Sequence, residues 1–306
     1  MKEMISRRSF LHVMGLGFGA AMLTACKTGT TDSPADSPAA SVPDPDTPVP
    51  FLTEDEFPRL DGSTACIPLM AQMKADVTGM DLLEAQTSIT VSTTAYAWEN
   101  FGLWSRSDSE DYGAQLLIVY EAPEYVKEEL AEADAKLEQK AIGRDALVFI
   151  VNEENPVQSL TQQQLRDIYA GKITNWKDVG GKDEKITVVN RAKGSGTRAT
   201  FEGAVLGGES AVKAQEQDSN GTVQKIVSTT PGAISYLAFS YAKTDGLHTL
   251  SLDNVAPTDK NITTNKWKIW SYEHMYTNGK AKGQAKKFID YMLSDDVQGS
   301  LVKKLG

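Results

Sequence analysis

Three short segments rich in serine and threonine stand where helices are expected to begin. They cover residues 61–65 just before Pro68, residues 92–94 before a helix expected at 95–101, and residues 191–197 before one at 199–206. A helix N-terminus offers unpaired backbone N–H groups, hydroxyl donors and the positive end of the helix dipole. These features predict binding of a small oxyanion without any catalytic group. N-capping, a routine role of Ser and Thr, is the alternative for each segment, above all for the first two.

The third segment carries the sharper signal. Gly194 and Gly196 flank Ser195, so the backbone can approach a ligand closely, and Arg191 supplies a fork-shaped positive charge four residues upstream. The spacing is not that of a phosphate-binding P-loop, because the GxxxxGK[ST] pattern is absent. It is not the GxSxG turn of a serine hydrolase either, because Lys193 and Thr197 occupy the positions that require glycine.

Continuous apolar runs predict the strands that position these segments. Such runs are typical of strands buried on both faces, and helical patterns lie between them. The expected fold class is therefore α/β. Thr161 and Gln164 form a capping-box pattern for one helix, and Gly171 is expected to end it. These runs predict strands at 116–120, 146–151, 186–189 and 233–239, and the segment 88–91 is also strand-like. A further amphipathic helix is expected at 283–293.

Charge and composition exclude several classes of protein. The net charge is −10, so the basic surface of a nucleic-acid-binding protein is missing and no nucleic-acid partner is expected. Any bound anion must be held by local donors, since the overall field repels it. The chain has two cysteines and three histidines, none with zinc-ligand spacing, so neither a metal nor another cofactor is expected.

The N-terminal region is typical of an exported lipoprotein. Residues 1–25 combine basic side chains with a short apolar run, as in a signal peptide, and their removal would leave a charge of −12. Leu23-Thr24-Ala25-Cys26 resembles a lipoprotein box, in which Cys26 is acylated, although a disulfide between Cys26 and Cys66 is also arithmetically possible. Residues 26–56 are expected to be the lipidated cysteine and a disordered tether, rich in Ser, Thr, Asp and Pro.

Several motifs together resemble the phosphate-binding proteins of bacterial ABC importers. They are 155–161, 165–169, 171–176 and 230–236, together with Gly194-Ser195-Gly196-Thr197-Arg198. The resemblance implies a two-lobed, periplasmic-binding-protein-like fold with a ligand cleft between the lobes. Lobe 1 would comprise residues 57–142 and 240–306, and lobe 2 would comprise residues 143–239. It also implies that the chain is a monomeric carrier and not an enzyme, and that it delivers its ligand to the permease subunits of the transporter.

The resemblance also implies which residues contact phosphate. The expected set is Ser63, Thr64, Ala65, Thr93, Thr94, Arg191, Ser195, Gly196 and Thr197, with Thr94 preferred in the second segment. The family places a carboxylate after the strand that follows the second segment, here the strand expected at 116–120, to accept the proton of hydrogen phosphate. Glu121 holds that position here, and Asp61 is the alternative. A carboxylate that faces the ligand accepts from a protonated anion and repels a fully deprotonated one such as sulfate.

Three other functions stay open at this point. Sulfate, molybdate or arsenate would change only the ligand. A phosphate-handling hydrolase would need a base beside Ser195, and none is placeable there. A lipoprotein that senses phosphate through a partner, without transport, would share every feature described above. The expected location is the outer face of the cytoplasmic membrane or a membrane surface in the periplasm, where the lipid on Cys26 would anchor the chain.

Overall fold

The computed structural model describes residues 49–105, 114–121, 124–132 and 136–299. The predicted signal peptide, Cys26 and most of the predicted tether lie outside these residues. The prediction of a disordered tether up to residue 56 was wrong for its last part, because Phe51 and Leu52 donate to the Val77 carbonyl and Leu52 is buried. Within the described residues, no helix has the length and apolar character needed to cross a membrane.

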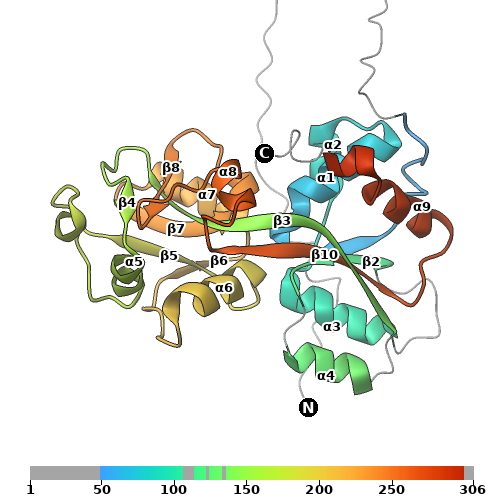
Figure 1. Cartoon of the computed structure of the whole chain (residues 1–306), viewed down its shortest axis with the longest axis horizontal. Coiled ribbons are helices and arrows are strands. Elements are labelled where there is room, and N and C mark those ends of the chain that lie inside the picture. Colours follow the sequence, from blue (N-terminus) through green and yellow to red (C-terminus); the bar gives the residue numbers. More distant parts are fainter. Residues whose placement is uncertain (1–48, 106–113, 122–123, 133–135, 300–306) are drawn as a thin grey trace, which may run out of the picture. The chain divides into compact units, whose positions relative to one another are not determined.

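Strands and helices alternate along the chain, as the predicted α/β class requires (Figure 1). The strands are β1 (Leu60–Gly62), β2 (Leu116–Val119), β3 (Leu137–Asn152), β4 (Ser159–Leu160), β5 (Thr187–Arg191), β6 (Gln215–Gln217), β7 (Ala233–Ala238), β8 (Leu247–Thr249), β9 (Ser251–Leu252) and β10 (Trp270–Asn278). The α-helices are α1 (Ile67–Thr78), α2 (Leu82–Ser88), α3 (Thr94–Ser105), α4 (Glu124–Glu132), α5 (Gln162–Tyr169), α6 (Gly196–Phe201), α7 (Asn220–Thr229), α8 (Asp259–Thr263) and α9 (Gly283–Met292). Short 3-10 helices are η2 (Thr64–Cys66), η3 (Trp176–Val179) and η5 (Phe239–Tyr241), and η4 (Glu202–Leu206) is a π-helical continuation of α6.

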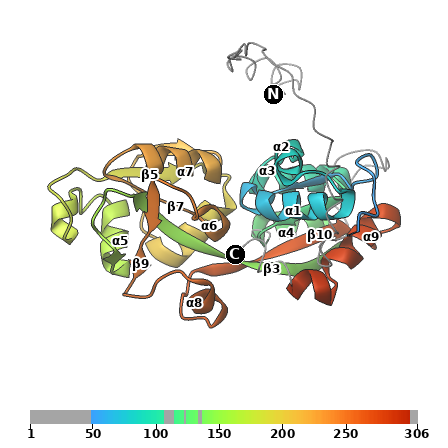
Figure 2. The same ribbon diagram turned by 90° about the horizontal axis from the view of Figure 1, so that it is seen from above.

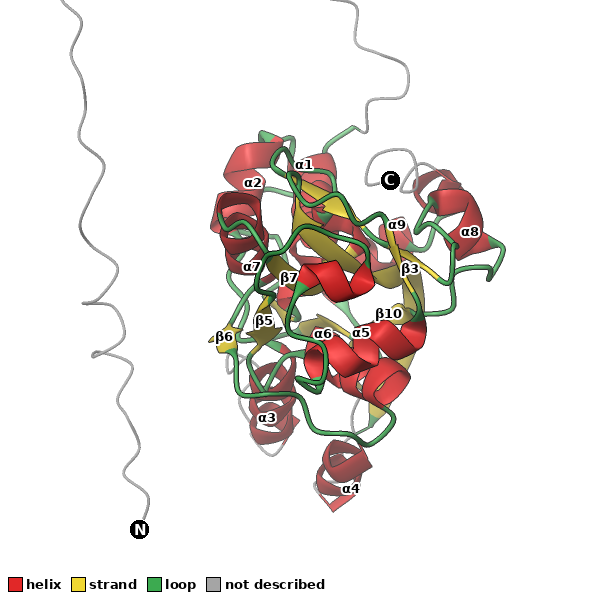
Figure 3. Ribbon diagram, turned by 90° about the vertical axis from the view of Figure 1, so that its left-hand side faces the viewer, coloured by secondary structure: helices red, strands yellow, loops and turns green. Residues whose placement is uncertain are grey.

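One sheet, in the order β1-β2-β10-β3-β7-β5-β6, runs through the described fold. The long strand β3 joins its two halves (Figure 1). Residues 137–146 of β3 pair with β10, and residues 147–152 pair with β7 and β8, all antiparallel. Helices cover both faces of the second half, with α7 on one side of β5 and β7 and α6 on the other (Figures 2 and 3). The buried run 146–151 therefore lies in a strand that both layers of helices cover.

Two separate hydrophobic cores form, one on each side of the place where the paired strands β3 and β10 pass from one half of the sheet to the other, called the crossing below. The first side packs α1 and α9 on β2, and Trp98 and Phe101 of α3 form a neighbouring cluster on the opposite face. The second core surrounds the end of β3 and includes Tyr169, Trp176 and Phe201. Tyr169 and Trp176 are both fully buried in it.

The second core also takes in residues that the sequence analysis assigned to lobe 1. Leu247, Leu250, Ile262 and Trp267 all pack there, and β8 pairs with β3 beyond residue 147. The chain therefore returns to the first core with β10, near residue 270, and not at residue 240. The apolar run of β7 ends at residue 238, which suggested an earlier crossing, but the segment after it folds back onto the same sheet.

Local signals predicted several element boundaries correctly. Thr161 and Gln164 form the expected capping box of α5, and Gly171 has a left-handed φ of 74° two residues after its end. Two expectations were wrong. Residues 88–91 form no strand, because Ser88 ends α2 and the extended residues after it find no sheet neighbour. The helix expected at 199–206 begins earlier, at Gly196, because Ser195 caps it.

Candidate functional site

The three hydroxyl-rich segments converge, although they come from both sides of the crossing. Arg191 at the end of β5 donates from Nη2 to the Thr64 hydroxyl at 3.2 Å, and the Ala95 backbone N–H donates to the Gly194 carbonyl at 3.2 Å. Gly196 lies so close to Thr94 that an added Cβ would stand 2.7 Å from its hydroxyl oxygen. The structure therefore brings together residues 64, 93–95 and 191–197, as the predicted binding site requires.

Arg191 is a buried positive charge without an acidic partner among the described residues. Its side chain is 1% exposed. It donates only to uncharged acceptors, which are the carbonyls of Gln217 and Asp218, the Asn220 amide oxygen and the Thr64 hydroxyl. Burial lowers the pKa of Arg191, which nonetheless remains protonated at neutral pH. A buried unpaired charge is costly, and an anion beside it would offset that cost.

Two buried hydroxyls near Arg191 have no hydrogen-bond partner among the described residues. They belong to Thr94, at the start of α3, and Thr197, in the first turn of α6. A buried polar group without a partner costs about 1–3 kcal/mol. Thr93, next to Thr94, adopts a φ of 86°, an uncommon and strained conformation for a β-branched residue. Strain and unpaired donors in one loop are typical of a binding site.

The serines of the first and third segments act as N-caps, the role that sequence analysis kept as an alternative. Ser63 accepts from the Ala65 backbone N–H at 3.2 Å, and Ser195 accepts from Arg198 at 3.3 Å. A serine oxygen that accepts in a cap still carries a hydroxyl proton that it can donate. Arg198 binds Glu202, Glu216 and the Arg191 carbonyl, which fixes the third segment from behind.

The two carboxylates considered for the proton of the ligand have different surroundings. Asp61 is buried and accepts from the Ser92 backbone and hydroxyl, both at 2.6 Å, so it joins the first and second segments. Glu121 follows β2 but is 62% exposed and pairs with Lys127 at 3.0 Å. Neither carboxylate hydrogen-bonds to Arg191, Thr94 or Thr197 within the described part of the chain.

Three residues that complete the site were not expected from the sequence. Asn220, the first residue of α7, is fully buried and accepts from Arg191 at 2.9 Å. Tyr241 donates to the Thr64 carbonyl at 2.9 Å, and the Tyr120 ring lies against Gly196. Each is a single polar residue outside any hydroxyl-rich segment, so only its position in the fold brings it to the site.

The chemistry of this arrangement is binding, through hydroxyls, helix N-termini and one guanidinium. The described residues contain no group of three or more His, Cys, Asp or Glu side chains that could hold a metal. Two cores joined by crossing strands, with an anion-binding set contributed by both, define the class of two-lobed anion-binding proteins.

Comparisons with known proteins agree with this class. The PBP superfamily domain matches residues 119–296. The phosphate-binding protein PstS of Bacillus subtilis is 46% identical over 180 residues, which span 58% of this chain and 60% of that protein. PstS of Borreliella burgdorferi is 30% identical over 258 residues, covering 80% and 87%. The chain therefore belongs to the PBP superfamily and, within it, to the PstS family of phosphate-binding proteins.

A solved structure extends the likeness to the fold. It is a phosphate ABC transporter substrate-binding protein of Clostridium perfringens with bound phosphate, 27% identical to this chain. The two superpose with a TM-score of 0.66, over 80% of this chain and 96% of that one. The predicted two-lobed, periplasmic-binding-protein-like fold is thereby confirmed.

Proposed function

We propose that this protein captures inorganic phosphate between its two lobes. The observation that carries the proposal is the buried Arg191 guanidinium, which has only uncharged acceptors among the described residues and lies in the same loop cluster as the unpaired hydroxyls of Thr94 and Thr197. A tetrahedral oxyanion would satisfy the charge and both hydroxyls at once. The relatives named as phosphate-binding proteins support phosphate as that anion.

The proposed contacts come from both lobes. Arg191, Ser195, Gly196 and Thr197 would hold the anion from the second side, and Ser63, Thr64, Ala65, Thr93 and Thr94 from the first. Glu121 would accept the proton of hydrogen phosphate, which requires its exposed ion pair with Lys127 to open. Exposed ion pairs contribute only about 0–1 kcal/mol, so this opening costs little.

We further propose that the chain delivers phosphate to the permease subunits of an ABC importer and performs no catalysis. The Clostridium perfringens structure is described as the substrate-binding protein of such a transporter. Cys26 would carry the lipid that holds a single, monomeric chain on the outer face of the cytoplasmic membrane. The net charge of −10 fits a protein that relies on local donors, and not on its overall field, to capture an anion.

Isothermal titration calorimetry of the chain from Asp46 onward, with phosphate and then sulfate at neutral pH, tests this function. We expect phosphate binding without a sulfate response, because a carboxylate at the site repels an anion that has no proton to donate. Glu121→Gln should weaken phosphate binding by about tenfold or more and admit sulfate, since the amide can donate where the carboxylate could not.

Glu129→Gln is the matched control, because it removes one exposed carboxylate from α4 without touching the site. If the wild type bound sulfate as tightly as phosphate, the proposal that phosphate is the ligand would be wrong, and another oxyanion would take its place. No heat with either anion would overturn the proposed function.

A further inference from the structure

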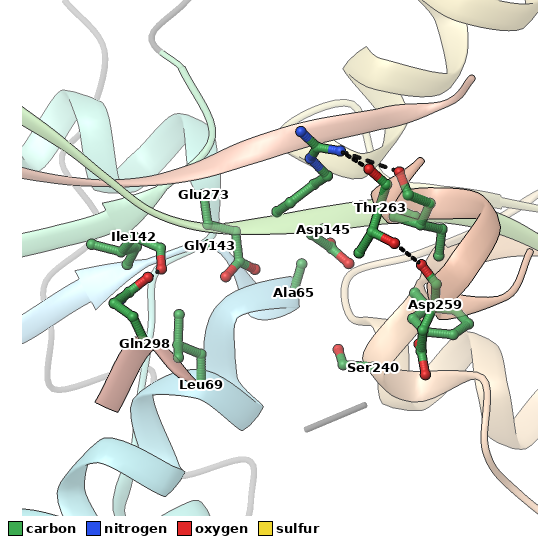
Figure 4. Close-up of a pocket in the computed structure, with 14 residues that line it drawn as sticks. Ala65, Leu69, Ile142, Gly143, Asp145, Ser240, Asp259, Thr263, Glu273 and Gln298 are labelled. Carbon is green, nitrogen blue, oxygen red and sulfur yellow. Dashed lines mark hydrogen bonds between the residues drawn. The ribbon is translucent and has the colours of Figure 1, made fainter. Parts of the chain in front are cut away.

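A cavity lies beside the paired strands β3 and β10 and shares Ala65 with the proposed phosphate site. It holds about 270 Å³, far more than the roughly 10–15 Å³ that one water molecule needs. Both cores contribute to its wall (Figure 4).

Two carboxylates from neighbouring strands face this cavity (Figure 4). Glu273 on β10 pairs in register with Gly143, two residues before Asp145 on β3. Glu273 is only 7% exposed, and its carboxylate accepts from the Cys66 thiol, which is a weak donor. Asp145 accepts from the Tyr120 hydroxyl at 2.6 Å. Neither carboxylate forms a salt bridge with a cation among the described residues.

The one cationic residue in the cavity wall is engaged elsewhere. The Arg144 guanidinium stacks on Trp270, 3.9 Å from the ring centroid. It also donates to the Ile262 carbonyl at 3.2 Å and to the Asn265 side chain at 3.0 Å. Its charge is therefore directed to the α8 side, and the two carboxylates keep an unmatched demand for positive charge.

Burial without a positive partner raises the pKa of both carboxyl groups. It raises the pKa of Glu273 to about 8, with a further contribution from the negative charge of Asp145, and it raises the pKa of Asp145 to about 6. The other titratable groups around them are Cys66, Tyr120, Tyr241 and Asp259, none of which supplies a positive charge at neutral pH. Without a bound cation, Glu273 therefore retains its proton at pH 7, and a cation that binds beside it would displace this proton.

The remaining wall is largely apolar. Ala65, Leu69 and Phe239 line it, together with Ile142 and Ile262. We propose that this cavity is a second binding site, for a small organic cation that places a primary ammonium group between Asp145 and Glu273 and a compact hydrocarbon body against the apolar wall. Two carboxylates and no third ligand suit an ammonium group with its three donors better than a metal ion.

Calorimetric titration of the chain from Asp46 onward with cyclohexylammonium chloride tests the proposal, with cyclohexanol as the neutral probe of the same shape. We expect saturable binding of the amine and none of the alcohol. Because binding displaces a proton from Glu273, the affinity should rise by up to about tenfold per pH unit between pH 6 and pH 8. The heat should also vary with the ionisation enthalpy of the buffer.

Glu273→Gln and Asp145→Asn should each weaken amine binding by about tenfold or more, because each removes one partner of the ammonium group. Glu138→Gln, which removes a carboxylate of β3 outside the cavity wall, should leave it unchanged. Circular dichroism of each variant establishes that it is folded. Absence of amine binding to the folded wild type, equal binding of cyclohexanol, or undiminished binding to Glu273→Gln would each overturn the proposal.

Discussion

Arg191, Thr94 and Thr197 share an unusual condition, which is burial without the partners that their chemistry calls for. The guanidinium donates only to uncharged acceptors, and the two hydroxyls have no partner among the described residues. Each of these arrangements lowers the stability of the ligand-free protein. Residues that lower stability in this way are expected at binding sites, where selection for ligand binding outweighs selection for stability.

The unpaired hydroxyls allow a test at the scale of single residues. Thr94→Val and Thr197→Val keep the shape of the side chain and remove a buried group without a partner, so each should leave the free energy of unfolding unchanged or raise it by about 1 kcal/mol. Each should also weaken phosphate binding by about tenfold or more, since a hydrogen bond to a charged group is lost. Urea unfolding and calorimetry measure the two effects.

Thr200→Val provides the comparison for these two variants. Its hydroxyl donates to the Gly196 carbonyl at 3.1 Å, one turn along the same helix. Removing this satisfied hydrogen bond should cost about 1 kcal/mol of stability. If Thr94→Val or Thr197→Val destabilised the protein as much as Thr200→Val and bound phosphate normally, these hydroxyls would have a structural role only.

At the scale of elements, the N-terminus of α6 determines how closely the two lobes approach each other at the site. Ser195 caps the helix, and Gly196 at its first position leaves room for Thr94 and Tyr120 of the opposite side. The helix continues into the π-helical segment η4, and Arg198 ties its first turns to Glu202 and Glu216. The helix N-terminus is therefore held rigidly where the anion is proposed to bind.

Gly196→Ala tests this close approach. The added Cβ would stand 2.6 Å from the Tyr120 ring and 2.7 Å from the Thr94 hydroxyl oxygen, closer than such atoms can pack. The variant should lose about 1–3 kcal/mol of stability and most of its phosphate affinity, as judged by thermal unfolding with and without phosphate.

Gly203→Ala is the matched control in the continuation of the same helix. Outside the neighbouring backbone of its own helix, no atom lies within 4 Å of the Cβ that it would add, so the substitution should be neutral or raise stability by up to about 1 kcal/mol. Normal phosphate affinity in Gly196→Ala would show that the two sides need not approach as closely as the structure has them.

At the scale of the whole described fold, β3 and β10 connect the two cores and carry the buried carboxylates between them. Glu273 retains a proton in the folded protein up to a pKa of about 8, whereas an unfolded glutamate releases its proton near its ordinary value of 4.5. Between these values the folded state binds more protons than the unfolded state. The stability that Glu273 contributes is therefore lost as the pH rises through this interval.

Unfolding free energies measured from pH 5 to pH 8.5 test this linkage. Wild-type protein should lose stability relative to Glu273→Gln as the pH rises, by on the order of 1–3 kcal/mol across the interval, since the amide does not titrate. Glu138→Gln should follow the wild type. Parallel curves for wild type and Glu273→Gln would mean that Glu273 ionises normally in the folded state.

The amino-acid sequence by itself determined the local chemistry of the site. Hydroxyl-rich helix starts, the glycines beside Ser195 and the capping box at Thr161 depend on neighbours only a few residues apart, so short patterns predict them. Periodicity likewise predicted α9 and the buried run in β3, because burial on one or both faces leaves a regular apolar pattern. The motifs of the family added the two-lobed fold.

Only the tertiary structure decided which distant residues meet. Asn220 and Tyr241 join the site through contacts across more than 150 positions of the chain, for which no local pattern exists. The return to the first core near residue 270 depends on strand pairing, and the extended segment 88–91 forms no strand because no neighbour is available. The pair Asp145 and Glu273 lies 128 positions apart in the sequence and becomes adjacent because β3 and β10 pair. A sequence specifies each segment's preferences, but burial and charge depend on the partner that packing supplies.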